Sequence, residues 1–142
     1  MRLLLDTNCV VALASDDHEH HAATYADFRR RRAEGQRIIV AAHAITEAYS
    51  VLTRLPPPLR MRPSDAIDVL DRTWGKCETV ALTAVELWQV LRECGAAGIS
   101  GGRTYDRVIA ECARRGKAAE ILTWNVRHFE GCGIPAVSPV TR

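Results

Sequence analysis

The sequence predicts an α/β protein with a mostly parallel central sheet and helices on both faces. Two observations predict this class. Short apolar segments alternate along the chain with longer amphipathic ones, and each short segment is apolar throughout. Strands that are buried on both faces have this pattern, and such strands pair in parallel. The chain has 142 residues, of which 47% are hydrophobic, so we expect one packed domain over 1–142.

The first half of the chain is expected to hold two strands and three helices. The strands are 2–5 and 37–40, and the helices are 8–14, 18–33 and 41–55. Ser15-Asp16-Asp17 is a candidate N-terminal cap for the second helix, whose end carries Arg29–Arg32, where the macrodipole favours cations. Gly35 stops that helix, and Pro56–Pro58 stop the third because proline cannot continue a helix.

The second half is expected to alternate in the same way. The helices are 63–74, 84–93 and 105–115, and the strands are 77–82, 120–123 and an edge strand at 136–137. Thr83 and Thr104 are candidate N-caps, because a hydroxyl accepts a hydrogen bond from the free backbone N–H groups of a first turn. Gly75, Gly95 and Gly116 are expected to end the three helices.

Composition excludes several classes of protein. The formal net charge of +2 is mildly basic, so it permits a nucleic-acid partner without arguing for one. No apolar run approaches the roughly 18 residues of a membrane span. Leu3–Leu5 is too short for the apolar region of a signal peptide, and Asp6 interrupts it. Five scattered cysteines without a C-x-x-C pair predict reduced, mostly buried thiols, and therefore a cytoplasmic protein.

Two acidic residues stand at informative positions. Asp6 directly follows the apolar run Leu3–Leu5, and ligands of open α/β sheets bind outside the carboxyl ends of the strands. Asp106 lies on the inner side of the helix 105–115 and in its first turn, where backbone N–H groups favour an anion. Asp106 is therefore a candidate ligand for a cation. A charge that merely satisfies the helix dipole would have the same pattern.

Glu47 has the opposite pattern. Ile45, Ala48, Tyr49 and Leu52 form the expected core stripe of its helix, whereas Glu47 falls on the polar face. Periodicity alone therefore indicates a solvated surface acid, unless another part of the molecule reaches that face.

Four motifs together resemble the PIN domain, and within it the VapC-type toxins of bacterial toxin–antitoxin pairs. They are Leu4–Asn8, Thr46–Pro56 with Glu47, Ser100–Asp106, and Leu122–Asn125 followed by His128-Phe129. The likeness covers nearly the whole chain, with the motifs in the order and spacing of the family. It implies a PIN-like three-layer sandwich.

The resemblance also implies a metal-dependent endoribonuclease that cuts structured cellular RNA of the tRNA or rRNA class. The family's carboxylates match Asp6, Glu47 and Asp106, which would converge at the carboxyl edge of the sheet and hold Mg²⁺ or Mn²⁺. Hard divalent cations prefer carboxylate and water oxygens. Such a cation neutralises a phosphodiester and lowers the pKa of a bound water.

The sequence departs from the family at one place. Members often carry a further acid at the position of Asn125 or of His128, and neither residue is acidic here. We expect Asn125 to act through its carbonyl oxygen or to position a metal-bound water. With fewer negative charges, one tightly bound ion is expected, with a second arriving alongside RNA.

Six further residues are candidates for supporting roles. Thr7, Asn8 and Thr123 are expected to orient carboxylates or waters, although ordinary capping of strand ends explains them equally well. Three cations near the proposed site, Arg103, Arg107 and Arg127, are expected to contact phosphates of the RNA. Each of them alone is better explained as a solvated charge.

The resemblance implies protein partners as well. A cognate VapB-type antitoxin would lay a helix or an extended segment in an apolar groove formed by the helices within 8–33 and 41–74. It would insert an arginine against the acids. A symmetric homodimer is also implied. The alternative is a non-catalytic module that binds RNA or a partner. A phosphatase is disfavoured, because such enzymes carry a second Asp at the position of Asn8.

Three other features are interpreted as structural. The run Asp16–His21 contains metal-binding residue types, and His18 and His21 are expected to share a helix face, but the run lies at an exposed helix start. Arg29–Arg32 are expected to form a solvated helix end rather than an RNA-binding run. The three tryptophans, Trp74, Trp88 and Trp124, are expected to be packing residues, with base stacking by Trp124 as the less favoured alternative.

Overall fold

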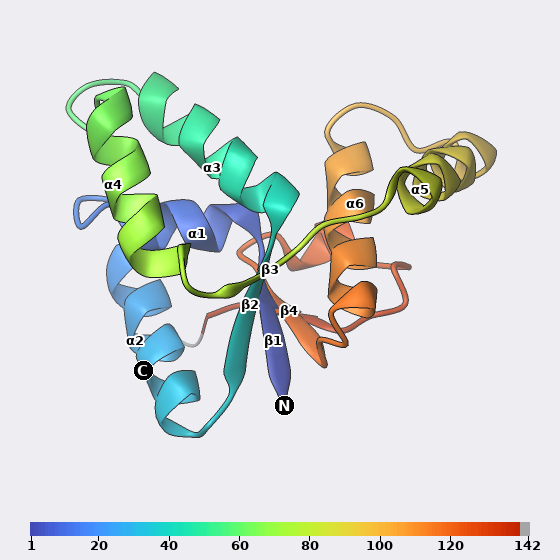
Figure 1. The fold of residues 1–142 in the computed structure, drawn as a ribbon, viewed down its shortest axis with the longest axis horizontal. Helices are drawn as coiled ribbons and strands as arrows, with labels where there is room; N and C mark the ends of the chain where they lie inside the picture. Colours follow the sequence, from blue (N-terminus) through green and yellow to red (C-terminus); the bar gives the residue numbers. More distant parts are fainter. Residues whose placement is uncertain (140–142) are drawn as a thin grey trace.

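The computed structural model describes residues 1–139, and it confirms the predicted α/β architecture. Five strands form one sheet in the order β3-β2-β1-β4-β5, and every pairing is parallel (Figure 1). The strands are β1 (Arg2–Leu5), β2 (Arg37–Ala41), β3 (Glu78–Val80), β4 (Glu120–Leu122) and β5 (Ala136–Val137). The predicted edge strand is therefore present, and the predicted strand 77–82 is shorter.

Helices connect the strands. They are α1 (Thr7–Ala14), α2 (His21–Ala33), α3 (Ala42–Arg54), α4 (Pro63–Trp74), α5 (Ala84–Ala97), α6 (Arg103–Arg115) and the 3-10 helix η1 (Val126–Phe129). α2 begins later than predicted because turns precede it, in which the His18 N–H bonds to the Ser15 carbonyl and the His21 N–H bonds to the His18 carbonyl. α5 continues through Gly95 because its left-handed C-cap is Gly98, with a φ of 70°.

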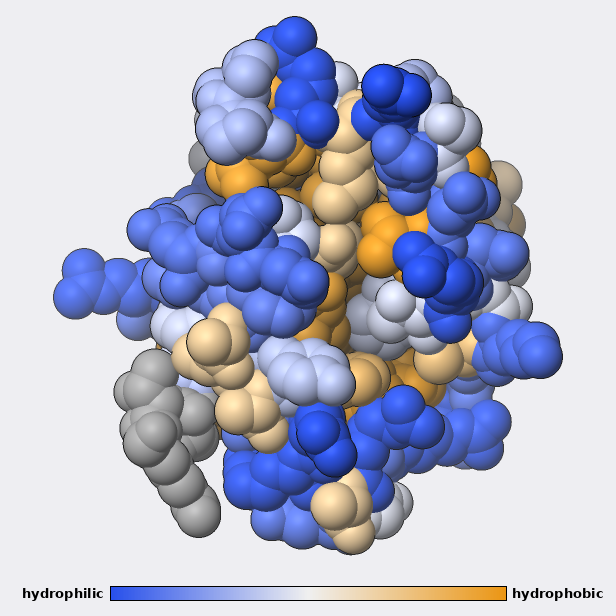
Figure 2. All heavy atoms as spheres, turned by 90° about the vertical axis from the view of Figure 1, so that its left-hand side faces the viewer, coloured by the Kyte–Doolittle hydropathy of each residue, from blue (hydrophilic) through white to orange (hydrophobic). Residues whose placement is uncertain are grey.

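The sheet separates two helical layers, as predicted. Successive side chains of a strand point to opposite faces. Leu3 and Leu5 accordingly pack with α1, α3 and α4, whereas Leu4 packs with α6. In Figure 1, α1 to α4 lie on one side of the sheet, and α5 and α6 lie on the other. The outer surface of the first layer is mainly hydrophilic, with apolar side chains exposed along its middle (Figure 2).

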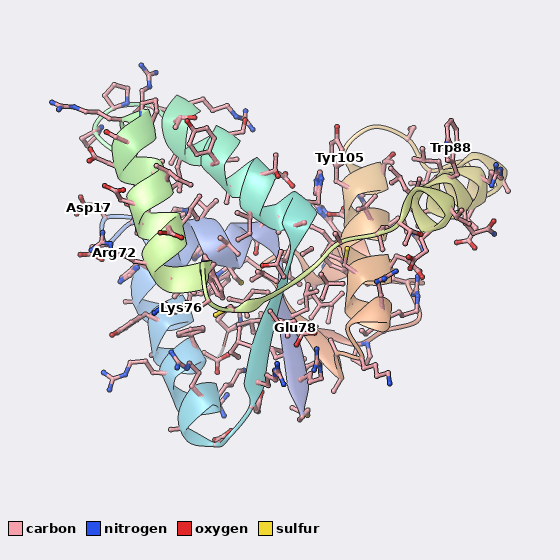
Figure 3. The ribbon with its side chains drawn as sticks, in the orientation of Figure 1. Asp17, Arg72, Lys76, Glu78, Trp88 and Tyr105 are labelled. Carbon is pink, nitrogen blue, oxygen red and sulfur yellow. The ribbon has the colours of Figure 1, made fainter. Side chains whose placement is uncertain are left out.

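Helix α5 extends away from the sheet, and Trp88 lies at its outer side (Figures 1 and 3). Its Val90 and Cys94 pack against Val108 of α6. Trp88 lies outside that cluster and is 59% exposed. The prediction that Trp88 packs in the interior is therefore wrong, whereas Trp74 is buried as predicted.

A buried ion-pair network joins α2 to the sheet. Arg31 is buried, and its Nε donates to the Oδ2 of Asp27 at 2.8 Å. The guanidinium also pairs with Glu120, the first residue of β4. The predicted solvated helix end is therefore wrong for Arg31, because the side chain faces the sheet at this turn of the helix. Arg29 and Arg32 are exposed, as predicted.

Two observations concern the membrane and the cysteines. Within residues 1–139, no helix is both long and apolar enough to cross a membrane. Four of the five cysteines are buried, and all five are free thiols. Their burial agrees with the sequence prediction.

Replacing Arg31 by Met is expected to lower the free energy of unfolding by about 2 kcal/mol, because Glu120 loses its cation and Asp27 keeps only Arg30. Urea denaturation measures the change. The matched control is Arg32→Met on the exposed side of the same helix, which is expected to stay within about 0.5 kcal/mol of the original protein. Equal losses in the two variants would contradict a special role for the buried network.

Candidate active site

Asp6 emerges where β1 ends, and its side chain is buried. Leu5 is in register with Val40 of β2 and Leu122 of β4, so the chains leave the three strands at one edge of the sheet. Asp6 is the N-cap of α1 and is only 5% exposed. Its Oδ1 accepts the Thr7 N–H at 2.8 Å. The acid is thus fixed by the turn from strand to helix.

A second set of hydrogen bonds links Asp6 to the end of β4. The hydroxyl of Thr123, which is fully buried, donates to the Asp6 Oδ2 at 2.7 Å. The same hydroxyl oxygen accepts the Asn8 amide at 3.2 Å and the Asn125 backbone N–H at 3.0 Å. The side-chain Oδ1 of Asn8 accepts the backbone N–H of Trp124 at 3.2 Å. The ends of β1 and β4 are therefore held together around one carboxylate.

The burial of Asp6 opposes its ionisation. The pKa of the Asp6 carboxyl is raised from 3.8 to about 6, chiefly by burial. Within this net value, the hydrogen bonds from Thr123 and Thr7 lower the pKa, and the negative charges of Asp106 and Glu47 add to the rise. The charges of the three acids therefore act on one another in the folded protein.

Glu47 is half-buried, so the expectation of a solvated acid is wrong. The first turn of α1 lies beside α3, and the Thr7 hydroxyl donates to the Glu47 Oε2 at 3.1 Å. The Nε2 of His43 lies 3.2 Å from the same oxygen, and His43 lowers the pKa of the Glu47 carboxyl. Tyr49, expected in the core stripe, is 37% exposed, because the stripe that is buried consists of Ala44, Ala48 and Leu52.

Asp106 lies in the first turn of α6, on the inner side, as predicted. Its side chain is 16% exposed, and its Oδ2 lies 3.5 Å from the Nδ1 of His128. Burial raises the pKa of the Asp106 carboxyl, while His128, Arg103 and Arg107 oppose that rise. His128 thus supplies an imidazole beside the acid at a position where the family often has a further carboxylate.

The three acids line one cavity of about 320 Å³, together with Asn125. Within residues 1–139, no three histidine, cysteine or carboxylate side chains are grouped closely enough to hold a metal ion as they stand. The donor set nevertheless suits a hard cation, because it consists of carboxylate oxygens that repel one another and face a common hollow. Binding such an ion would draw the carboxylates together.

Of the remaining candidates, Thr7 and Asn8 line this cavity, and Thr123 is bonded to Asp6. Thr7, Asn8 and Thr123 make the hydrogen bonds described above. Arg103 and Arg127 are exposed, and the Nη1 of Arg107 donates to the Gly131 carbonyl at 3.2 Å. Phosphate binding by these arginines stays a prediction.

Two residues that connect the helices of the site, His43 and Tyr105, were not predicted from the sequence. His43 pairs with Glu47, and its ring stacks on Tyr105 of α6, with ring centroids 4.8 Å apart and planes 18° apart. Tyr105, labelled in Figure 3, lines the cavity and directly precedes Asp106 in the chain. The only sequence signal was the spacing of four residues between His43 and Glu47, which places them on one side of a helix.

The segment Asp16–His21 also differs from expectation. His18 and His21 do not share a helix face, because α2 begins only at His21. His18 instead lines the cavity of the acids. Trp124 is half-buried and stacks on His20, with ring centroids 4.0 Å apart, which agrees with a packing role.

The chain is similar to named ribonucleases. A sequence profile described as "PIN domain" matches residues 3–130. Ribonuclease VapC27 of Mycobacterium tuberculosis is 33% identical over 138 residues, which cover 95% of each chain. Ribonuclease VapC40 of the same species is 33% identical over 125 residues, which cover 88% of this chain and 87% of that protein.

Solved structures share the fold. VapBC2 from Rickettsia felis, bound to a DNA fragment from their promoter, matches with a TM-score of 0.70 and 17% identity, covering 97% of this chain and 98% of that chain. FitAcB from Neisseria gonorrhoeae matches with a TM-score of 0.64 and 14% identity, covering 96% and 97%. At these identities the likeness concerns the fold alone.

Replacing Asp6 by Asn is expected to stabilise the metal-free protein at pH 7.5 by up to about 3 kcal/mol. The folded-state pKa of about 6 exceeds the ordinary 3.8, so ionisation penalises folding progressively as the pH rises through this window. Asn keeps an N-cap acceptor. Urea denaturation in EDTA at pH 7.5 and pH 4 measures the difference, which should shrink to about 0.5 kcal/mol at pH 4, close to the ordinary pKa.

The control is Asp68→Asn, which removes an exposed acid from α4 and should change neither value beyond about 0.5 kcal/mol. A loss of stability in Asp6→Asn at pH 7.5 would contradict the electrostatic account.

Proposed function

We propose, from the premise that this chain belongs to the PIN domain family, that it is an endoribonuclease toxin neutralised by a cognate antitoxin. Its substrate class is structured cellular RNA, such as tRNA or rRNA. The observation that carries the proposal is the cavity shared by Asp6, Glu47 and Asp106. These acids come from the end of β1, from α3 and from α6, so only the folded chain unites them.

A divalent ion, Mg²⁺ or Mn²⁺, would be held by Asp6, Glu47 and Asp106, with Asn125 at the same cavity offering an amide oxygen. When bound, it supplies neutralisation of the phosphate and a water of lowered pKa. Thr7 and Thr123 keep the Asp6 oxygens oriented toward their partners. One tightly held ion, with a second entering alongside RNA, suits a site with three acids and an amide.

Histidines and arginines around the acids offset part of the negative charge that an RNA substrate would meet. His43 and His128 each lie beside one carboxylate, so they lessen the repulsion between the acids while no ion is bound. Arg103 and Arg107 stand close enough to Asp106 to affect its pKa. We propose that these two cations and Arg127 contact phosphates of the RNA that flank the cut.

The proposed antitoxin site lies on the outer surface of the α1–α4 layer. A hollow of about 540 Å³ is lined by apolar Leu13, Met61 and Val69, with Asp17 and Arg72 also along its lining (Figure 3). Exposed apolar side chains run along the middle of this face (Figure 2). An amphipathic helix or an extended segment fits such a surface. We propose that an arginine of the antitoxin reaches the acids.

A homodimer is proposed through α5. Trp88 and Val85 on this helix are 59% and 78% exposed, and Leu87 and Leu91 are exposed as well. Exposed apolar side chains gathered on one element mark an interaction surface. We further propose that the protein acts in the cytoplasm, where five free thiols stay reduced.

Purified protein is expected to cleave a labelled tRNA pool only with Mg²⁺ or Mn²⁺. Asp6→Asn and Asp106→Asn should each lower the rate by more than about 100-fold, since even an outer-shell partner of a metal ligand contributes about 10- to 100-fold. Gel electrophoresis of the RNA measures the rate. Asp68→Asn, at an exposed site on α4, should cleave like the original protein.

Cleavage that persists in both site variants would come from a contaminant and would remove the assignment. RNA binding without cleavage under every metal tested would instead favour the non-catalytic module. The lack of an acid at Asn125 and at His128 is the sequence feature that supports this alternative.

Trp88→Glu is expected to weaken the dimer at least about 30-fold, because a large aromatic side chain at the centre of an interface is a typical hot spot. Light scattering over a dilution series measures the mass. Ile67→Glu places the same charge at an exposed apolar residue of α4 and should leave the dimer intact. A monomeric original protein, or equal effects of the two substitutions, would contradict dimerisation through α5.

A further inference from the structure

His18 is an unexplained member of the acid cavity. It lies in the turns between α1 and α2 and lines the same hollow as Asp6, Glu47 and Asp106. We infer that His18 is a substrate-binding residue whose Nε2–H donates a hydrogen bond to a backbone oxygen of the RNA. This inference rests on the proposed function and deepens it.

The loop fixes which nitrogen of the ring carries the proton. The His20 backbone N–H donates to the Nδ1 of His18 at 3.1 Å, so Nδ1 must present its lone pair. Burial lowers the pKa of His18, and His20 lowers it further, which favours the neutral ring. A neutral imidazole with an accepting Nδ1 carries its hydrogen on Nε2. The free nitrogen of His18 is therefore a donor.

This tautomer favours a role for His18 in binding substrate over a role in binding metal. A histidine that coordinates an ion through Nε2 needs the lone pair on that nitrogen and the proton on Nδ1. In that tautomer the His20 N–H would lose its acceptor. The loop therefore disfavours His18 as a metal ligand and leaves its Nε2–H for an oxygen acceptor.

The loop is held in place by contacts with the strand edge that positions Asp6. The ring of His20 stacks on Trp124 with planes 14° apart, and the Trp124 indole N–H donates to the Thr24 hydroxyl at 2.9 Å. The Nδ1 of His21 lies 2.8 Å from the Ala12 carbonyl oxygen. Trp124 directly follows Thr123, the hydrogen-bond donor to Asp6. His18 is thus positioned before any ligand binds.

Two polar side chains of the cavity already donate within the protein, whereas the Tyr105 hydroxyl and the Asn125 amide also line it. The Thr7 hydroxyl is committed to Glu47, and the Asn8 amide is committed to Thr123. The carboxylates that line the cavity repel phosphate. A donor from the α1–α2 loop would offset this repulsion on the substrate, and such hydrogen bonds to charged oxygens are among the stronger ones.

Two substitutions separate the donor from the loop contact. In His18→Asn, the side-chain oxygen takes the place of Nδ1 and can accept the His20 N–H, but nothing replaces Nε2. In His18→Gln, an amide N–H takes the place of Nε2. Both proteins are compared by cleavage of a labelled tRNA pool with Mn²⁺. They are also compared by binding of the same RNA in the Asp106→Asn background, where cutting is lost.

We expect His18→Asn to lose roughly tenfold in RNA affinity and in kcat/KM, and His18→Gln to stay within roughly threefold of the original protein. Stabilisation of the protein by Mn²⁺ should be unchanged in both. Ala22→Asn, at an exposed position beside the same loop and outside the cavity lining, is the matched control and should bind RNA normally. A DNA strand of the same sequence identifies the acceptor, because an effect that persists there points to phosphate and one that disappears points to the ribose hydroxyl.

Normal binding by His18→Asn would overturn the inference, and so would equal losses in His18→Asn and His18→Gln. Loss of Mn²⁺ stabilisation in both would overturn it in favour of a metal ligand. If the original protein binds RNA without cutting it, the proposed function fails while the binding comparison still tests His18. If the original protein binds no RNA, both fail.

Discussion

The site depends on the hydrogen bonds of the buried Asp6 carboxylate, because they join β1, α1 and β4 at one point. One oxygen accepts from Thr7, where α1 begins, and the other accepts from Thr123, where β4 ends. The hydrogen bonds that attach α1 to the sheet therefore also orient an acid in the cavity. Since burial disfavours its charge, the fold holds a costly group where a cation would offset the cost.

The other acids are positioned by the same principle with different partners. Thr7 donates its backbone N–H to Asp6 and its hydroxyl to Glu47, so this one residue of α1 also fixes the acid of α3. His43 lies between Glu47 and the ring of Tyr105, and so connects α3 with α6. Each acid therefore belongs to a contact between elements, and the geometry of the cavity follows from how the helices pack around the sheet edge.

Local pattern predicted the fold class, because apolar strands and helix boundaries leave signals in adjacent residues. It also found Asp6 and Asp106, since a strand end and a helix face are local properties. Glu47 was not visible in this way, because its burial depends on Thr7, which lies 40 positions earlier in the chain. Only the family resemblance singled it out. The α1–α2 loop was missed because nothing in the histidine run distinguishes a turn from a helix start.

Helix α5 is packed in a way that favours local unfolding. Its buried side chains, Val90 and Cys94, belong to a small cluster with Val108, Leu82 and Ile99, while Trp88 and Val85 are exposed. Local unfolding begins where few apolar contacts hold an element, so we expect the amide protons of α5 to exchange with solvent while the sheet stays closed. In the proposed dimer, a second copy covering α5 would slow that exchange, and association would then stabilise the local order of this helix.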